Sequence, residues 1–155
     1  MPFIINSLPK SHFQQFFELS QGERAARHAV GVIANKKPGF PCRVSLMDAE
    51  VGEEMILVNY EHQTAATPFK SSHAVYVRRG ADQARLQKGE VPEMLRSRTL
   101  SLRAFDGKGM LVAADLVDGR ALEKLIEEMF SDPGAGYIHI HFAKPGCYAA
   151  RADRA

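Results

Sequence analysis

Short apolar runs, bounded by Pro, Gly or Asn, predict strands along most of this chain. The strongest is EMILVNY at residues 54–60, which is rich in strand-forming residues and apolar on both faces. The closing run at 137–143 alternates polar and apolar residues, and we expect regular structure to end there. The strands predicted in this way are 3–8, 29–34, 42–46, 54–60, 73–78 and 137–143.

Helical periodicity is confined to a few segments. Residues 120–130 place apolar side chains at helical spacing, with Asp118 as the expected N-cap. Two shorter helices should begin at Ser11 and Ser20, because each serine is followed three residues later by Gln or Glu, the capping-box pattern. We expect about three helices in the folded protein.

A β-hairpin is predicted in the second half of the chain. The extended segments 96–105 and 110–117 flank Asp106 and Gly107, residue types that tolerate positive φ. Strands and helices mix along the sequence without a βαβ rhythm. We therefore expect an α+β fold, a single domain over residues 1–155, with a mostly antiparallel sheet and the helices packed on it.

Composition narrows the class of protein. Lys and Arg (20) nearly balance Asp and Glu (18), so a net charge of +2 creates no long-range field for nucleic acid or anionic lipid. No apolar run reaches the length of a membrane span, and the first ten residues lack the features of a signal peptide. Only two cysteines, Cys42 and Cys147, are present, too few for a disulfide framework. We expect a cytoplasmic protein that binds neither nucleic acid nor a membrane.

The closing stretch concentrates reactive side chains in YIHIHFAKPGCYAARADRA. Strand alternation puts His139 and His141 side by side on one face, and the apolar residues between them on the core face. We therefore expect both imidazoles to point away from the core. Paired imidazoles of this kind suit metal binding or proton transfer, although histidines on a solvent-facing strand also occur without a function.

The residues that follow the strand add further chemistry. Pro145 and Gly146 bend the chain, so that Cys147 lies just beyond the strand end. A thiol beside an imidazole or guanidinium loses its proton more readily, and Arg151 and Arg154 offer planar forks for a carboxylate or phosphate. The alternative is a buried, unreactive cysteine and two arginines on a solvated tail.

Cys42 and Arg43 follow a second loop rich in Pro and Gly. Loops at one rim of a sheet build sites, so we expect Cys42 to lie near Cys147, and near His139 or His141. His62 and His73 flank the loop between two predicted strands, where a solvated position is expected. His12 and His28, near helix ends, are expected to be structural.

These segments resemble DUF1203, a bacterial family of unknown function. The resemblance is carried by the segments 38–62, 69–78 and 137–155 and covers nearly the whole chain. Its sharpest motifs are P-C-R with a D-A-x-x-G-E turn, and the terminal H-x-H with G-C-Y-x-x-R-x-x-R. The resemblance implies a bacterial, cytoplasmic protein and no particular activity. The positions that match the two motifs are Cys42, Arg43, Asp48, Gly52, Glu53, His139, His141, Gly146, Cys147, Arg151 and Arg154.

Three hypotheses follow, and the sequence names no cofactor. The first is a site for a small anionic molecule, in which His139, His141 and Cys147 do the chemistry and the ligand is held by Cys42, Arg43, Arg151 and Arg154. The second is a transition-metal site built from the two histidines and one or both cysteines. It would have to be assembled from distant strands, because no C-x-x-C or H-E-x-x-H occurs. The third is a non-enzymatic interaction module, such as a homodimer.

Overall fold

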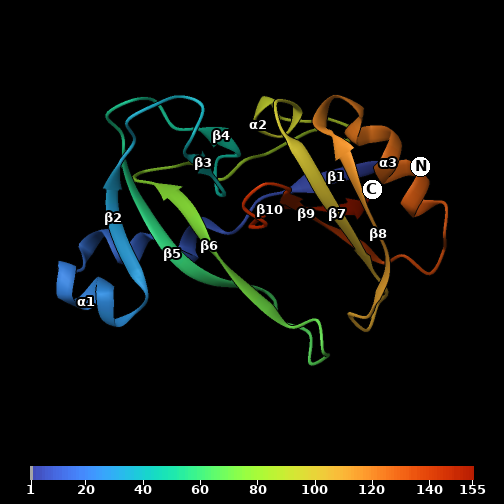
Figure 1. Ribbon diagram of the computed structural model, residues 1–155, viewed down its shortest axis with the longest axis horizontal. Coiled ribbons are helices and arrows are strands. Elements are labelled where there is room, and N and C mark those ends of the chain that lie inside the picture. Colours follow the sequence, from blue (N-terminus) through green and yellow to red (C-terminus); the bar gives the residue numbers. More distant parts are fainter. Residues whose placement is uncertain (1) are drawn as a thin grey trace.

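Two sheets organise the strands of residues 2–155, the part of the chain that the computed structural model describes (Figure 1). In the first, all neighbouring strands are antiparallel, whereas the second contains a parallel contact between β3 and β6. Sheet 1 has the order β1 (Phe3–Asn6), β10 (Tyr148–Arg154), β9 (Tyr137–Phe142), β7 (Thr99–Phe105) and β8 (Leu111–Asp118). Sheet 2 has the order β2 (Ala29–Ile33), β5 (Glu54–Gln63), β6 (Ser71–Arg78), β3 (Pro41–Cys42) and β4 (Met47–Asp48). The predicted α+β class is confirmed, with the strands divided between two sheets.

The helices are short, with three to nine residues each. The capping box predicted at Ser20 and Glu23 is formed and begins α1. The helix predicted to begin at Ser11 is wrong, because Phe13 and Phe16 are buried at a spacing of three, which suits two 3₁₀ turns. The bounds are η1 (Lys10–His12), η2 (Gln14–Glu18), α1 (Gln21–Ala26), α2 (Glu93–Arg96), η3 (Gly119–Ala121) and α3 (Leu122–Phe130).

Helix α3 covers the face of sheet 1 that turns away from sheet 2 (Figure 1). Its apolar stripe, including Leu122, Leu125 and Ile126, packs against Ile138 and Ile140 of β9. The Asp118 side chain accepts a hydrogen bond from the Arg120 amide just before this helix, as predicted for a cap. The opposite face of sheet 1 is left to face sheet 2.

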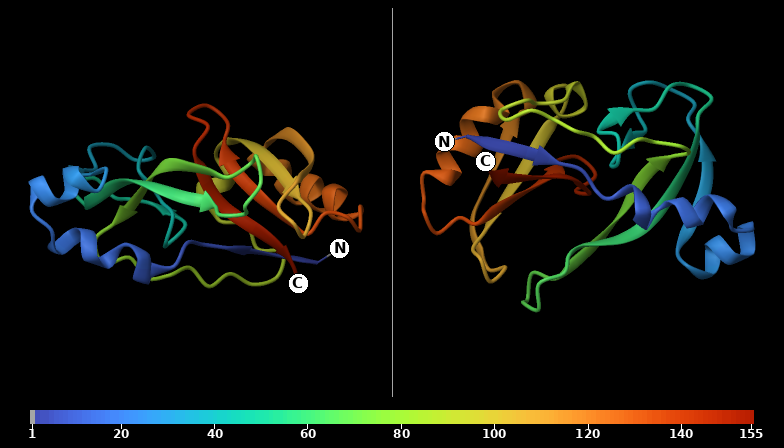
Figure 2. Two further views of the ribbon diagram at one scale, coloured as in Figure 1. Left: turned by 90° about the horizontal axis from the view of Figure 1, so that it is seen from below. Right: turned by 180° about the vertical axis from the view of Figure 1, so that it is seen from behind.

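Several local predictions fail where distant strands supply the hydrogen bonds. Of the strand predicted at 42–46 only Cys42 lies in a strand, β3, and residues 43–46 form a tight turn in which the Leu46 amide donates to the Cys42 carbonyl. Strand β5 extends to Gln63, three residues beyond its predicted end. Regular structure does not end at residue 143, because β10 pairs with both β9 and β1. Figure 2 shows β1 beside β10, with the two chain ends close together.

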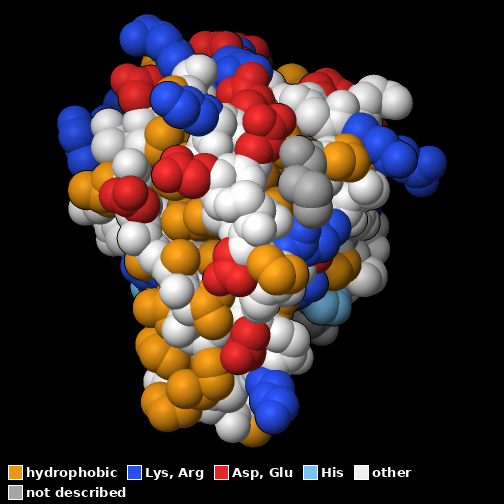
Figure 3. All heavy atoms as spheres, turned by 90° about the vertical axis from the view of Figure 1, so that its right-hand side faces the viewer, with side chains coloured by type: hydrophobic (Ala, Val, Ile, Leu, Met, Phe, Trp, Pro, Cys, Tyr) orange, Lys and Arg blue, Asp and Glu red, His pale blue; other side chains and the backbone are white. Residues whose placement is uncertain are grey.

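The predicted hairpin is present as β7 and β8, joined by a turn at Asp106. The positive φ falls at Gly109 (+85°), where an added Cβ would lie 2.3 Å from the Cβ of Ala65. Strand β8 is an edge strand with exposed hydrophobic side chains, and Figure 3 shows such side chains gathered on this side of the molecule. None of the helices in residues 2–155 is long and apolar enough to cross a membrane.

Candidate functional site

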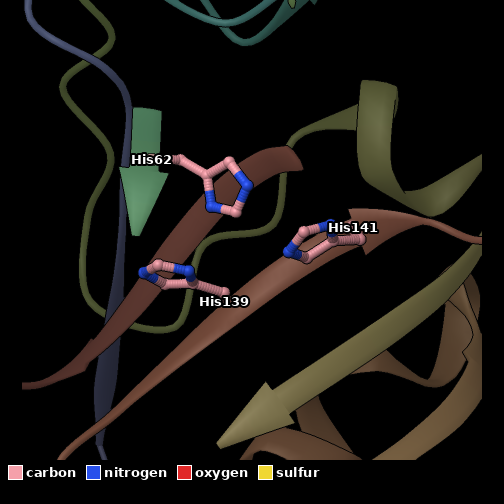
Figure 4. A group of neighbouring side chains, drawn as sticks. All are labelled: His62, His139 and His141. Atoms are coloured by element: carbon pink, nitrogen blue, oxygen red, sulfur yellow. The ribbon is translucent and has the colours of Figure 1, made fainter. Parts of the chain in front are cut away.

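Three imidazoles meet where sheet 1 faces sheet 2. The alternation of β9 places His139 and His141 on the same face, as predicted, and β5 brings His62 opposite them. One potential ligand atom from each ring lies within 4.8 Å of those from the other two. Figure 4 shows the rings arranged around one common space. We call His62, His139 and His141 the histidine cluster.

The two β9 histidines of the cluster are buried and His62 is half-buried, so the rings point away from the apolar core of sheet 1 without facing solvent. His139 is 2% exposed and His141 is fully buried, because sheet 2 covers the face on which they lie. The ring of Tyr148 completes the enclosure by stacking on His62 at a centroid distance of 4.8 Å. At β9 both faces of sheet 1 are therefore interior, one apolar and the other carrying His139 and His141.

Hydrogen bonds orient the rings of the histidine cluster. Nδ1 of His141 lies 2.9 Å from the Gly146 carbonyl oxygen, which can only accept, so Nδ1 carries the proton and Nε2 keeps a lone pair. Nε2 of His62 lies 2.6 Å from Nδ1 of His73, and the two rings stack. When His62 donates in this pair, its Nδ1 is likewise left with a free lone pair.

Each ring of the histidine cluster also has one buried nitrogen without a hydrogen-bond partner. These atoms are Nδ1 of His62, Nδ1 of His139 and Nε2 of His141. A buried polar atom without a partner carries a free-energy cost of about 1–3 kcal/mol, so such atoms in a native protein require an explanation. Here three of them belong to rings that converge on one point.

Electrostatics keep the imidazoles neutral. Burial, followed by the positive charge of neighbouring groups, lowers the pKa of His62 and of His139 to about 3. Burial also lowers the pKa of His141 to about 4, although its hydrogen bond to Gly146 acts in the opposite direction. Arg103 is among the positive groups that lower all three values. The rings are therefore unprotonated near neutral pH, the form in which imidazole binds a metal ion.

The spacing of the ring nitrogens is close to that of a metal site. Nitrogen ligands about 2.0–2.1 Å from a tetrahedral zinc ion are about 3.4 Å apart. The 4.8 Å limit within the histidine cluster contracts to that spacing through side-chain shifts of about 1 Å. Among residues 2–155 this group of potential metal ligands contains His62 and no cysteine, so a third histidine stands where a thiol was predicted.

The P-C-R segment and the G-C-Y loop meet, as predicted, and Arg43 joins them. Its buried guanidinium, only 1% exposed, donates to the Tyr148 carbonyl at 2.8 Å, the Pro41 carbonyl at 2.7 Å and the Sγ of Cys147 at 2.9 Å. Burial lowers the pKa of Arg43, while the Cys147 sulfur raises it. Arg43 therefore ties the two segments together and, within residues 2–155, has no side-chain carboxylate as a partner.

Cys42 lies apart from this chemistry. It is fully buried in the core of sheet 2, and its Sγ accepts hydrogen bonds from the Ser45 and Arg78 amides at 3.5 and 3.4 Å. Cys147 packs instead against the core of sheet 1. Cys42 is not in the group of potential metal ligands found in residues 2–155, and its predicted place beside a ligand stays a prediction.

The two terminal arginines have different surroundings. Arg151 pairs in register with His139, bonds to Asp153 at 2.8 Å and lies over the ring of Tyr137. Arg154 donates to main-chain carbonyls of residues 130, 132 and 135, at the end of α3. Arg154 is therefore not part of the histidine site, because its fork is used to hold the chain after the helix.

Sequence reasoning missed two residues of the site. His62 was expected in a loop and lies within β5, where the pairing with β6 shifts between Glu61 and Gln63. His73 is the third residue of β6 and bonds to His62. The sequence does carry a signal for His62, because the strand alternation continues through Tyr60 and His62 after the apolar residues end. A search for hydrophobic residues alone therefore ends this strand too early.

A family model described as "Protein of unknown function (DUF1203)" matches residues 39–154. The matched region includes all three residues of the histidine cluster, together with Arg43 and Cys147. No match was found among curated proteins or among solved structures. The chain therefore belongs to the DUF1203 family.

Proposed function

We propose that this DUF1203 protein binds a divalent transition metal ion of the zinc class through His62, His139 and His141. The observation that carries the proposal is the convergence of two buried imidazoles and one half-buried imidazole, each with a buried nitrogen that has no hydrogen-bond partner within residues 2–155. A metal ion would satisfy all three nitrogens at once. Imidazole is a preferred ligand of zinc, copper and nickel. Because the rings are neutral, they can bind a metal ion without first losing a proton.

The surroundings of the rings support this proposal over simple burial. Metal-bound histidines usually donate their second N–H to a carbonyl or another fixed group, which sets the tautomer and the ring orientation. The Gly146 carbonyl has this position for His141, and His73 has it for His62. Three protein ligands leave one position of a tetrahedral ion open, which is the arrangement of catalytic rather than structural zinc sites.

The metal content of the protein tests the proposal. The chain should be produced without a polyhistidine tag, purified without nickel resin, and analysed by inductively coupled plasma mass spectrometry. We expect about one transition-metal ion per chain, and reconstitution with Co²⁺ should give the strong visible absorption of a tetrahedral site. His139→Gln and His141→Gln should lose both signals. His28→Gln, at an exposed position just after α1, is the matched control.

Far-UV circular dichroism separates loss of metal from loss of fold. Should either β9 variant unfold, His62→Gln replaces it, because that ring is only half-buried. A wild-type protein that takes up neither zinc nor cobalt would overturn the proposal. So would folded variants that bind the metal as tightly as the wild type.

The other expectations from the sequence stay predictions. The reading of His139, His141 and Cys147 as one catalytic set receives less support, since Cys147 contacts Arg43 and is not in the group of potential metal ligands. Bacterial origin, a cytoplasmic location, the lack of nucleic-acid binding and a homodimer are likewise untested.

A further inference from the structure

We propose that a cleft beside the histidine cluster binds a small organic carboxylate with an apolar, ring-sized body. The cleft has a volume of about 770 Å³, within the range of small-molecule sites. Strand β6, the bend after β9 and the loop before β3 line it, so both sheets contribute. This inference does not depend on a bound metal, since none of the three cluster residues lines the cleft.

The charged side chains of the cleft are all cationic. Lys36, Arg43, Arg98 and Lys144 line it, without an Asp or Glu. Arg98 is neutralised by a two-pronged contact with Asp48, at 2.6 and 2.9 Å, but Arg43 bonds only to carbonyls and to a sulfur. A buried guanidinium without a carboxylate creates a positive potential that favours an anion.

The two lysines are the groups free to contact that anion directly. All the donor nitrogens of Arg43 are directed at protein acceptors. Within residues 2–155 neither Lys36 nor Lys144 forms an ion pair, and both are exposed. Their flexible stems allow both ammonium groups to turn toward a ligand at the mouth of the cleft.

The remaining walls select an apolar body for the ligand. The side chains that form them are Pro38, Pro41, Leu57, Tyr76, Phe142 and Pro145. The guanidinium groups of Arg43 and Arg98 both contact the ring of Phe142, each 4.9 Å from its centroid. Aromatic rings and prolines thus line the cleft, which suits a planar or ring-shaped group. An inorganic anion would leave this apolar surface unused.

A matched pair of ligands tests both features of the site. Binding of 1-naphthoate and of its uncharged analogue 1-naphthamide should be measured by isothermal titration calorimetry, with and without added zinc. We expect one molecule of 1-naphthoate per chain and an affinity at least about tenfold above that of the amide, decreasing with added salt. The double variant Lys36→Met and Lys144→Met should lose about tenfold in naphthoate affinity and none in naphthamide affinity. Lys88→Met with Lys124→Met, at exposed positions outside the cleft, should bind like the wild type.

A second readout places the ligand. Cys147 lines the cleft and Cys42 is fully buried, so alkylation by iodoacetamide reports on Cys147. Saturating naphthoate should slow this alkylation several-fold in the wild type and less in the Lys36 and Lys144 double variant. Equal binding of the acid and the amide, unchanged affinity in that variant, or alkylation indifferent to naphthoate would each overturn the proposal. Because the titration includes zinc-free protein, a failed metal site leaves the result interpretable.

Discussion

Acidifying the metal-free protein from about pH 7 to about pH 5 should destabilise it, because His139 and His141 are buried as neutral rings. Their pKa values in the folded protein are about 3 and about 4, below the ordinary value of 6.5. In the unfolded chain both rings take up a proton below about pH 6.5. Their contribution to stability is therefore complete above that pH and is lost as the pH falls toward the folded-state values.

The size of the effect follows from the two pKa values. At about pH 5 an unfolded imidazole lies roughly 1.5 pH units below its pKa, and each unit corresponds to about 1.4 kcal/mol. Each buried ring therefore loses about 2 kcal/mol of its contribution to the free energy of unfolding, and the pair loses about 4 kcal/mol. His139→Gln removes one titrating ring, so the variant should lose about 2 kcal/mol less than the wild type over the same range.

The assay is urea unfolding at about pH 7, 6 and 5 in the presence of EDTA, followed by far-UV circular dichroism. His28→Gln, which removes an exposed imidazole, should keep the wild-type dependence on pH. Identical losses in the wild type and in His139→Gln would show that the pKa of His139 in the folded protein is not lowered relative to the unfolded chain. The argument for a neutral set of metal ligands would then fail.

Three further outcomes are expected. His73→Phe keeps the stacking on His62 but removes the hydrogen-bond partner of His62. Zinc affinity, measured in competition with a chelating dye, should therefore fall by about tenfold or more. An unchanged affinity would show that His73 does not position His62. Arg154→Met should lower the free energy of unfolding in urea by about 2 kcal/mol or more, because main-chain carbonyl groups lose a charged hydrogen-bond donor. The metal content of this variant should equal that of the wild type. A double-mutant cycle of Asp48→Asn and Arg98→Met should give a coupling energy of about 1–3 kcal/mol, because both side chains of this ion pair are mostly buried. A coupling energy near zero would mean that solvent screens the pair.

Local sequence patterns alone determined the features that depend on neighbouring residues. The alternation of 137–142 places both β9 imidazoles on one face, because successive side chains of a strand point to opposite sides. The capping box at Ser20 and the hairpin turn at Asp106 also form as predicted, since each is held by hydrogen bonds within a few residues. The motifs around Arg43 and Cys147 correctly pointed to two segments that meet.

Only the tertiary structure decided what those side chains face. Residues 148–154 have no strong hydrophobic pattern, and they become β10 because β9 and β1 supply hydrogen bonds on both edges. Sheet 2 covers the histidine face of β9 and brings in His62 from a strand more than seventy residues earlier in the chain. Arg154 turned to the end of α3 because carbonyls of residues 130–135 lie within its reach there. Such contacts join residues far apart in the chain, and their formation depends on the register and the stacking of two sheets, which the spacing of residues along one strand does not encode.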